Sequence, residues 1–266
     1  MLRLDGKVAV VTGIGSVGPG WGNGKAIATL FARQGATVFG VDIDLAAAEE
    51  TRAIIEGEGH TCVVRRCDMT DSADVAAAVA DCVERFGRID VLVNNVGGSA
   101  PGGPATMTEE AWDTQVEFNL KTAFLGCHHV LPVMLRQGGG AVVNLSSVAG
   151  IRQHIGRTHA AYSATKAAIV ELSRSIAIQH AAEGIRCNAV LPGLMHTPLV
   201  EQRLAPQIAG GDVEALIAAR HAKVPVGHMG DAWDVAHAAL YLVSDEGRYV
   251  TATQIVVDGG YSSVTP

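Results

Sequence analysis

The sequence predicts one α/β domain, 1–266, built on a doubly wound parallel sheet of seven strands with helices on both faces. Short apolar runs alternate with segments of helical periodicity along the chain, and this order is typical of parallel strands joined by helices. No Pro/Ser-rich linker interrupts the alternation. Glycines and polar residues follow the expected strands, at the carboxyl ends where such sheets bind ligands.

Each expected element rests on its own periodicity. The strands are apolar runs at 7–12, 36–42, 61–67, 89–94, 140–146, 185–190 and 254–258. The helices have apolar residues every three or four positions, at 24–34, 45–58, 72–86, 109–136, 161–182, 199–221 and 232–244. Right-handed crossovers between parallel strands then place these helices on both faces of the sheet.

The first strand runs into a glycine-rich loop that leads to a helix. This order predicts a dinucleotide site, because glycines let the backbone approach a pyrophosphate whose charge meets the helix N-terminus. Two registers compete, Gly13 with Gly18 and Gly20, or Gly13 with Gly22 and Gly24. We prefer the second, because its glycines lead directly into the helical pattern. The surplus residues 15–21 would then bulge out near the adenosine phosphates.

The second strand ends in Asp42, 18 residues after Gly24. A carboxylate there is placed to hold a ribose diol, and it would repel a 2′-phosphate. NAD(H) is therefore favoured over NADP(H). Lys25 is the exception to consider, since the expanded loop could direct this cation toward a phosphate.

The fifth strand and the helix after it carry the expected catalytic groups. Tyr162 and Lys166 are four residues apart, on one face of a helix, and Ser146 and Ser147 close the strand before it. A free tyrosine titrates near pH ~10, and a neighbouring ammonium lowers its pKa by favouring the phenolate. Ser147 could bind the oxygen of a carbonyl or alcohol, to which Tyr162 passes a proton.

In this order and spacing, the motifs resemble the classical short-chain dehydrogenase/reductase family, with a Rossmann-type fold, over about residues 5–260. They are Thr12-Gly13, Gly22-Asn23-Gly24, Cys67-Asp68-Met69, Asn94-Asn95-Val96-Gly97, Phe118-Asn119-Leu120, Ser147, Tyr162 with Lys166, Asn188, Pro192-Gly193, Thr197-Pro198 and Asp258-Gly259-Gly260.

Three positions depart from the family pattern. Eight residues, in place of the usual three, separate Gly13 from Gly22. Val96 replaces an alanine and Ala252 replaces a glycine. Longer glycine loops resemble those of enoyl-thioester reductases, but these carry Tyr and Lys seven apart, and the seventh residue after Tyr162 is Ile169.

The resemblance implies the cofactor residues. Asp68 would receive the adenine amino group, Asn94 and Gly97 would line the adenosine ribose, and Thr197 would hold the carboxamide. For Asp68 the alternative is a helix cap. The full implied set is Gly13, Gly22, Gly24, Asp42, Asp68, Met69, Asn95, Gly97, Tyr162, Lys166, Pro192, Gly193 and Thr197.

The resemblance also implies direct hydride transfer with a Ser-Tyr-Lys-Asn set. Ser147 and Tyr162 would hydrogen-bond the substrate oxygen, and Lys166 would bind the nicotinamide ribose. Asn119 would hold a water that relays protons from Lys166. The alternative for Asn119 is a buried polar residue in a helix-helix contact.

The substrate is expected to be small to medium in size and mostly apolar, because the lid segment 194–222 is rich in Leu, Ala and Ile. A hinge within this lid is expected at Gly210-Gly211. The candidate substrate residues are Ser99, Ser147, His154, Met195 and His196. Arg152 and Arg157, with nearby histidines, could instead bind an acidic group.

Composition narrows the functional classes. A net charge of −7 without a Lys/Arg cluster argues against nucleic-acid binding. No apolar run approaches the ~20 residues that span a bilayer, and the first strand leaves no room for a signal peptide. Five cysteines without a C-x-x-C pair, and histidines without ligand spacing, argue against a disulfide frame or a metal site. A cytoplasmic enzyme without membrane contact is therefore expected.

The expected function is an NAD(H)-dependent oxidoreductase that interconverts a secondary alcohol and a ketone. One alternative is an isomerase or dehydratase on the same fold, which usually brings a longer sugar-nucleotide domain. Another is a non-catalytic NAD-binding regulator, which would be expected to lose Tyr162 or Lys166. The resemblance, and the apolar circumference of the helix 161–182, predict a homotetramer.

Overall fold

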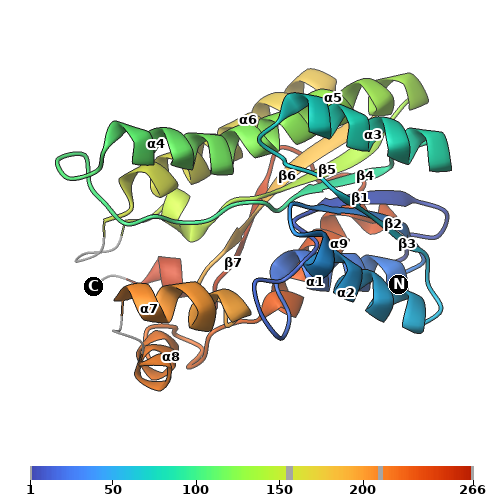
Figure 1. The fold of residues 1–266 in the computed structure, drawn as a ribbon. Coiled ribbons are helices and arrows are strands. Elements are labelled where there is room, and N and C mark those ends of the chain that lie inside the picture. Colours follow the sequence, from blue (N-terminus) through green and yellow to red (C-terminus); the bar gives the residue numbers. More distant parts are fainter. Residues whose placement is uncertain (1, 154–157, 209–211, 265–266) are drawn as a thin grey trace.

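The computed structural model describes residues 2–153, 158–208 and 212–264 (Figure 1). Its sheet has seven strands in the order β3-β2-β1-β4-β5-β6-β7, and every pairing is parallel. The chain therefore has the predicted single-domain, Rossmann-type α/β fold. The strands are β1 (Val8–Thr12), β2 (Thr37–Asp42), β3 (Cys62–Arg66), β4 (Val91–Asn94), β5 (Gly140–Leu145), β6 (Ile185–Pro192) and β7 (Gln254–Val257).

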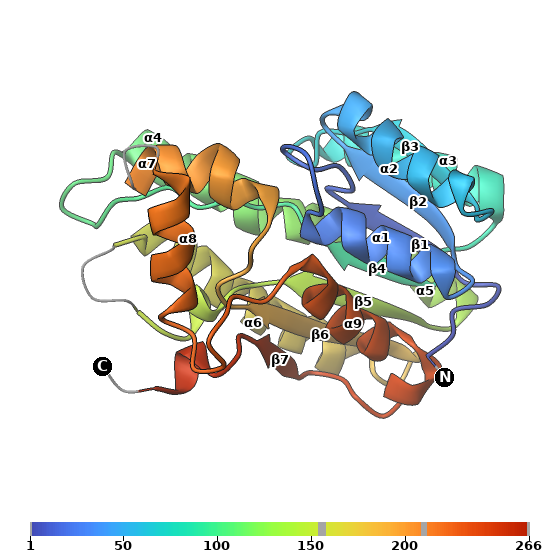
Figure 2. The same ribbon diagram turned by 90° about the horizontal axis from the view of Figure 1, so that it is seen from below.

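Helices cover both faces of the sheet (Figures 1 and 2). On one face lie α1 (Asn23–Arg33), α2 (Leu45–Gly57) and α9 (Ala232–Val243), and on the other lie α3 (Ser72–Phe86), α5 (Thr122–Gln137) and α6 (Ala160–His180). Strand side chains alternate between the two apolar cores: Val11 and Val143 pack on the first face, Val10 and Val142 on the second. Burial on both faces explains why the strands read as continuous apolar runs.

The predicted helix 109–136 differs from the observed structure. It consists of α4 (Glu109–Gln115), a π-helical segment (Val116–Lys121) and α5. The wider turn carries Asn119, which is fully buried and bonded to the loop after β4. Such π-helical turns are frequent at functional sites.

The predicted helix 199–221 is also divided. A π-helical segment (Val200–Leu204) leads into α7 (Ala205–Ile208), and α8 (Val213–His221) follows. Asp212 caps α8 by accepting a hydrogen bond from the backbone of Ala215. The expected hinge, Gly210-Gly211, lies outside the described residues.

The five cysteines are free and buried. Burial raises the pKa of the Cys62 and Cys82 thiols to about 12. These thiols therefore remain protonated and act as small apolar core residues. Within the described ranges, no helix is both long and apolar enough to cross a membrane.

Candidate active site and dinucleotide site

The glycine loop turns sharply between β1 and α1. Gly13 has a φ of +66°, a left-handed conformation that glycine adopts without strain. Helix α1 begins at Asn23 with Gly22 as its N-cap, in agreement with the preferred register. A Cβ atom on Gly24 would lie 1.9 Å from the Gly13 carbonyl oxygen, so only glycine permits this contact between helix and loop.

The N-terminus of α1 is not neutralised by the described residues. Gly22 supplies no side-chain cap, and the first turn contains no acidic residue. The Asn23 Oδ1 atom is buried without a hydrogen-bond partner in the described chain. Lys25 is 7 % exposed, and its ammonium lies 5.4 Å from the centre of the Trp21 ring. Free backbone donors and a buried cation fit an anion such as a dinucleotide pyrophosphate.

The surplus loop residues are held at both ends and exposed between them, with Val17 45% exposed. Trp21 packs against Trp233 of α9, with ring centroids 4.7 Å apart. At the other end, Asp42 Oδ2 accepts a hydrogen bond of 2.8 Å from the Gly15 backbone. Gly18 packs against Gln202, since a Cβ there would lie 2.9 Å from Gln202 Cγ. The Trp21–Trp233 contact and the Gly15–Asp42 hydrogen bond thus fix the ends of the loop. Between them, Gly18 contacts the segment expected to form the lid.

Asp42 ends β2 with both carboxylate oxygens accepting backbone hydrogen bonds. Oδ2 binds the Gly15 amide, and Oδ1 binds the Asp44 amide at 3.0 Å. No cationic side chain pairs with Asp42 in the described part of the protein. Within the described residues, the Asp42 carboxylate therefore has no counter-ion at the strand end.

Asp68 and Met69 follow β3. Asp68 Oδ1 accepts hydrogen bonds from the Thr70 amide and hydroxyl, at 2.9 and 2.7 Å, which hold the pKa of Asp68 below its usual value. Asp71, and not Asp68, caps α3, so the capping alternative for Asp68 is wrong.

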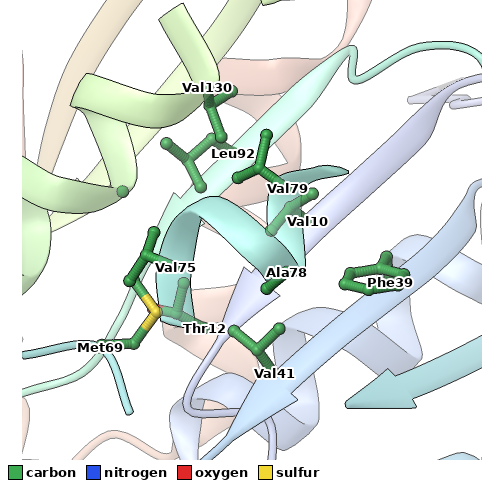
Figure 3. A pocket seen from close by; sticks show the side chains of 11 residues that line it. Val10, Thr12, Phe39, Val41, Met69, Val75, Ala78, Val79, Leu92 and Val130 are labelled. Carbon is green, nitrogen blue, oxygen red and sulfur yellow. The ribbon is translucent and has the colours of Figure 1, made fainter. Parts of the chain in front are cut away.

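The Met69 side chain turns away from this edge. It is 6 % exposed and lines a small apolar pocket between the sheet and α3 (Figure 3). The pocket is lined only by core residues such as Val75, so it belongs to the packing of the sheet. Any contact of Met69 with a cofactor would have to come from its backbone.

The loop after β4 joins the glycine loop to the candidate catalytic groups. Asn94 points into the core, where Nδ2 donates to Asn144 Oδ1 at 2.8 Å. Asn95 Nδ2 donates to the Thr12 and Gly13 carbonyls, at 3.1 and 3.0 Å, and so ties β4 to the glycine loop. A Cβ atom on Gly97 would lie 3.0 Å from Lys166 Nζ, so this glycine makes room for the lysine.

Two serines at the end of β5 have different surroundings. Ser146 is buried, and its hydroxyl donates to the Lys166 carbonyl at 2.6 Å. Ser147 is half-buried, and its Oγ accepts a hydrogen bond from the Ala149 amide at 3.1 Å. Among the described residues the Ser147 hydroxyl proton has no acceptor, whereas the Ser146 proton is used within the fold.

Tyr162 and Lys166 lie one turn apart on α6, with Lys166 Nζ 5.8 Å from the centre of the Tyr162 ring. Nζ donates to the Leu145 carbonyl of β5 at 2.8 Å. Lys166 is 4 % exposed, and this burial lowers its pKa to about 8. The ammonium is thus held by the sheet on the side of the Tyr162 ring, and a positive charge near a phenol favours the phenolate.

Asn119 is fully buried beside these groups. Its Oδ1 accepts from the Gly98 amide at 2.9 Å, and Nδ2 donates to the Gly98 and Gln115 carbonyls at 3.0 Å each. Gln115 Oε1 in turn accepts from the Ala100 amide at 3.1 Å. Sequence reasoning missed Gln115, because only the π-helical turn brings it to this loop.

The residues after β6 separate into core and surface. A Cβ on Gly193 would lie 2.5 Å from Asp258 Cβ, so glycine is required next to Pro192. Met195 is 8 % exposed and packs into the core that contains α9, so its side chain does not line an open cavity. His196 is exposed, with Nε2 2.8 Å from Glu201 Oε1. Thr197 is half-buried at the start of the lid segment.

The remaining candidate substrate residues have different surroundings. Arg152 donates to the Ser262 and Val264 carbonyls and so anchors the C-terminal segment. Ser99 Oγ lies 3.1 Å from His159 Nδ1, and the His159 ring lies 6.4 Å from that of Tyr162. His154 and Arg157 lie outside the described residues. In the described ranges, no group of three or more His, Cys, Asp or Glu side chains is arranged to hold a metal.

Comparison with known proteins agrees with this geometry. Residues 19–262 match the family model described as Enoyl-(Acyl carrier protein) reductase. The chain is 39% identical over 262 residues to the 2-(R)-hydroxypropyl-CoM dehydrogenase of Xanthobacter autotrophicus, covering 97% of this chain and 99% of the relative. It is also 39% identical over 261 residues to oxidoreductase UcpA of Salmonella typhimurium, covering 98% and 96%.

A solved structure described as a short-chain dehydrogenase/reductase from Burkholderia xenovorans is 52% identical. It superimposes with a TM-score of 0.95 over 99% of each chain. Whole-chain identity and a shared fold exclude a chance match of single motifs. The chain is therefore an oxidoreductase that belongs to the classical short-chain dehydrogenase/reductase family.

Proposed function

We propose that this protein is an NAD(H)-dependent oxidoreductase that interconverts a secondary alcohol and a ketone. The observation that carries the proposal is the pairing of Tyr162 with Lys166, held against β5 beside Ser147. The matching family model is described as an enoyl reductase, but the four-residue Tyr/Lys spacing favours carbonyl chemistry.

In the proposed mechanism a bound nicotinamide supplies or accepts the hydride. Ser147 donates its hydroxyl proton to the substrate oxygen and orients it. Tyr162 passes a proton to that oxygen in reduction and removes it in oxidation. Lys166 stabilises the phenolate electrostatically, and Asn119 positions the loop at Gly98 over these groups. Transition-state charge on the oxygen thus meets prearranged donors.

The cofactor set is proposed from the same edge of the sheet. Gly13, Gly22 and Gly24 bring the uncapped end of α1 to the pyrophosphate, and Lys25 is placed at that end. Asp68, Asn95 and Gly97 border the adenosine half. Pro192, Gly193 and Thr197 border the nicotinamide half.

Asp42 provides the test of cofactor choice. Asp42→Asn removes the charge but keeps an acceptor for the Gly15 amide. We expect wild-type kcat/KM to be higher with NAD(H) than with NADP(H), and the variant to narrow this ratio by about 10- to 100-fold, since a hydrogen bond to a charged group contributes ~1.5–3 kcal/mol. Steady-state A340 assays over a panel of alcohols and ketones, with both cofactors, measure it.

Asp44→Asn is the matched control, because this residue caps α2 and is exposed. Its cofactor ratio should equal that of the wild type. A wild-type preference for NADP(H) would contradict the assignment of Asp42 and would point to Lys25 as a phosphate ligand.

The two alternatives predict different behaviour in the same assay. An isomerase or dehydratase would give product without net change in NADH absorbance. A binding regulator would give neither product nor a change in NADH absorbance. Such a regulator would be expected to lose Tyr162 or Lys166, whereas this chain has both, with Lys166 Nζ 5.8 Å from the Tyr162 ring centre. Turnover with stoichiometric cofactor oxidation or reduction selects the proposed function.

We also propose a cytoplasmic homotetramer with a substrate lid at 194–222. Buried, unpaired cysteines are compatible with a reducing compartment. The outer surface of α5 and α6 carries large apolar side chains, with Phe124 48% and Ile178 69% exposed. Light scattering at micromolar concentration should give four times the 27.6 kDa chain mass, and a monomeric mass would contradict the assembly.

A further inference from the structure

The π-helical segment Val200–Leu204 contacts both the glycine loop and the loop after β4. Gln202 packs on Gly18 of the expanded glycine loop. In the loop after β4, a Cβ on Gly98 would lie 3.8 Å from Nη1 of Arg203. Figures 1 and 2 show the orange segment that leads into α7 beside the blue glycine loop. Adjacent residues of this segment therefore reach the two loops.

The Arg203 guanidinium consequently lies beside Gly98, one residue along the chain from the glycine that packs against Lys166. Gly98 bonds to Asn119 through both its amide and its carbonyl, and Gly97 is packed against Lys166 Nζ. Because consecutive Cα atoms are ~3.8 Å apart, Arg203 Nη1 and Lys166 Nζ are separated by no more than about 14 Å. A ligand that reacts beside Lys166 and extends past Gly98 would therefore meet Arg203.

The guanidinium is also available for a ligand. Arg203 is exposed and makes no hydrogen bond or ion pair with the described residues. Glu201, the acid nearest in sequence, pairs with His196 at 2.8 Å. Glu117, the neighbour of Phe118 beside Gly98, pairs with Lys121 at 3.1 Å. By contrast, Arg152 is bound to backbone carbonyls.

A guanidinium is charged at every physiological pH and presents a planar fork of donors to an oxyanion. We propose that Arg203 binds a terminal oxyanion of the substrate, a carboxylate or sulfonate, while the alcohol or ketone carbon reacts at the other end. This inference rests on the proposed function and specifies its substrate class as short hydroxy or oxo acids. The expanded glycine loop contributes to this anion site, because Gly18 packs against Gln202 and so helps to orient the adjacent Arg203.

The test uses methyl ketones of three lengths, 3-oxobutanoate, 4-oxopentanoate and 5-oxohexanoate, each beside its neutral methyl ester. With NADH, wild-type enzyme should prefer the acid over the ester in kcat/KM for at least one length, by about 10- to 100-fold. Arg203→Gln should lower this acid-to-ester ratio by a similar factor. Arg203→Lys should keep part of it, since it retains the charge but loses the fork.

Arg136→Gln is the matched control, because Arg136 is an exposed arginine near the end of α5. Its acid-to-ester ratio should equal that of the wild type. Repeating the assay at the most favourable length with the corresponding sulfonate separates a preference for carboxylate from one for sulfonate. A wild-type ratio near one at every length, or an unchanged ratio in Arg203→Gln, would overturn the inference.

Direct binding separates this inference from the proposed function. The keto acids are titrated into the enzyme–NADH complex, with quenching of NADH fluorescence as the readout. Binding that depends on Arg203 without any NADH oxidation would refute the proposed function and leave the anion site standing. Oxidation of NADH by esters and acids at equal rates would support the function and refute the anion site. Absence of both binding and turnover would refute both.

Discussion

Tyr162→Phe is expected to lower kcat by about 10³-fold, within the range by which a positioned acid or base contributes to catalysis. The substitution removes only the phenol oxygen. The ring, half-buried at the start of α6, keeps its packing. NADH affinity should remain within about threefold, because an interaction made only in the transition state is lost from kcat and not from cofactor binding.

Two measurements check this expectation, steady-state turnover at A340 and NADH titration by fluorescence. Tyr249→Phe is the matched control, since Tyr249 is 100% exposed and far along the chain from the site. It should have wild-type values for both. Turnover of Tyr162→Phe near the wild-type rate would remove the tyrosine from the mechanism, whatever its NADH affinity.

Lys166→Met is expected to damage both turnover and cofactor binding, each by at least about tenfold, because a charged hydrogen bond contributes ~1.5–3 kcal/mol. Methionine has a similar length and fills the same buried position. Loss of the ammonium removes the charge 5.8 Å from the Tyr162 ring and the proposed donor to the nicotinamide ribose. A variant with normal NADH affinity would show that the ammonium does not contact the cofactor.

The pH dependence of NADH binding gives a second readout. Because burial lowers the pKa of Lys166 to about 8, its charge is present at lower pH and is lost as pH rises through that value. Wild-type NADH affinity should therefore fall above about pH 8, with the midpoint shifted upward where the bound anion favours the ammonium. In Lys166→Met this fall should be absent.

Folding provides the control for this variant. The folded-state pKa is below the unfolded value, so the unfolded chain binds more protons between them, and stability rises with pH across that interval. Below the folded-state pKa, Lys166 is charged in both states, and burial of that charge lowers the free energy of unfolding by its full amount. Replacing the ammonium at pH 7 should thus leave Tm close to the wild-type value, although the bond to the Leu145 carbonyl is lost. A large drop in Tm would show that lost activity reflects unfolding.

The amino-acid sequence by itself determined the fold, and it singled out Tyr162 and Lys166 as the proposed catalytic pair. Alternating apolar runs and helical segments specify a parallel sheet, because burial on both faces requires that pattern. The spacing of Tyr162 and Lys166 places them on one face of a helix regardless of tertiary context. The start of α1 at Asn23 follows equally from local glycine and helix signals.

The tertiary structure decided which side chains are available to a ligand. Met195 is apolar and precedes the lid, as an exposed substrate residue would, but packing with α9 buries it. Arg152 is held by the C-terminal segment, more than a hundred residues away, whereas Arg203 reaches Gly98. These partners are distant in sequence, and helical or strand periodicity reports only local geometry. Whether a side chain is free to bind a ligand depends on long-range packing, which helical and strand periodicity do not report.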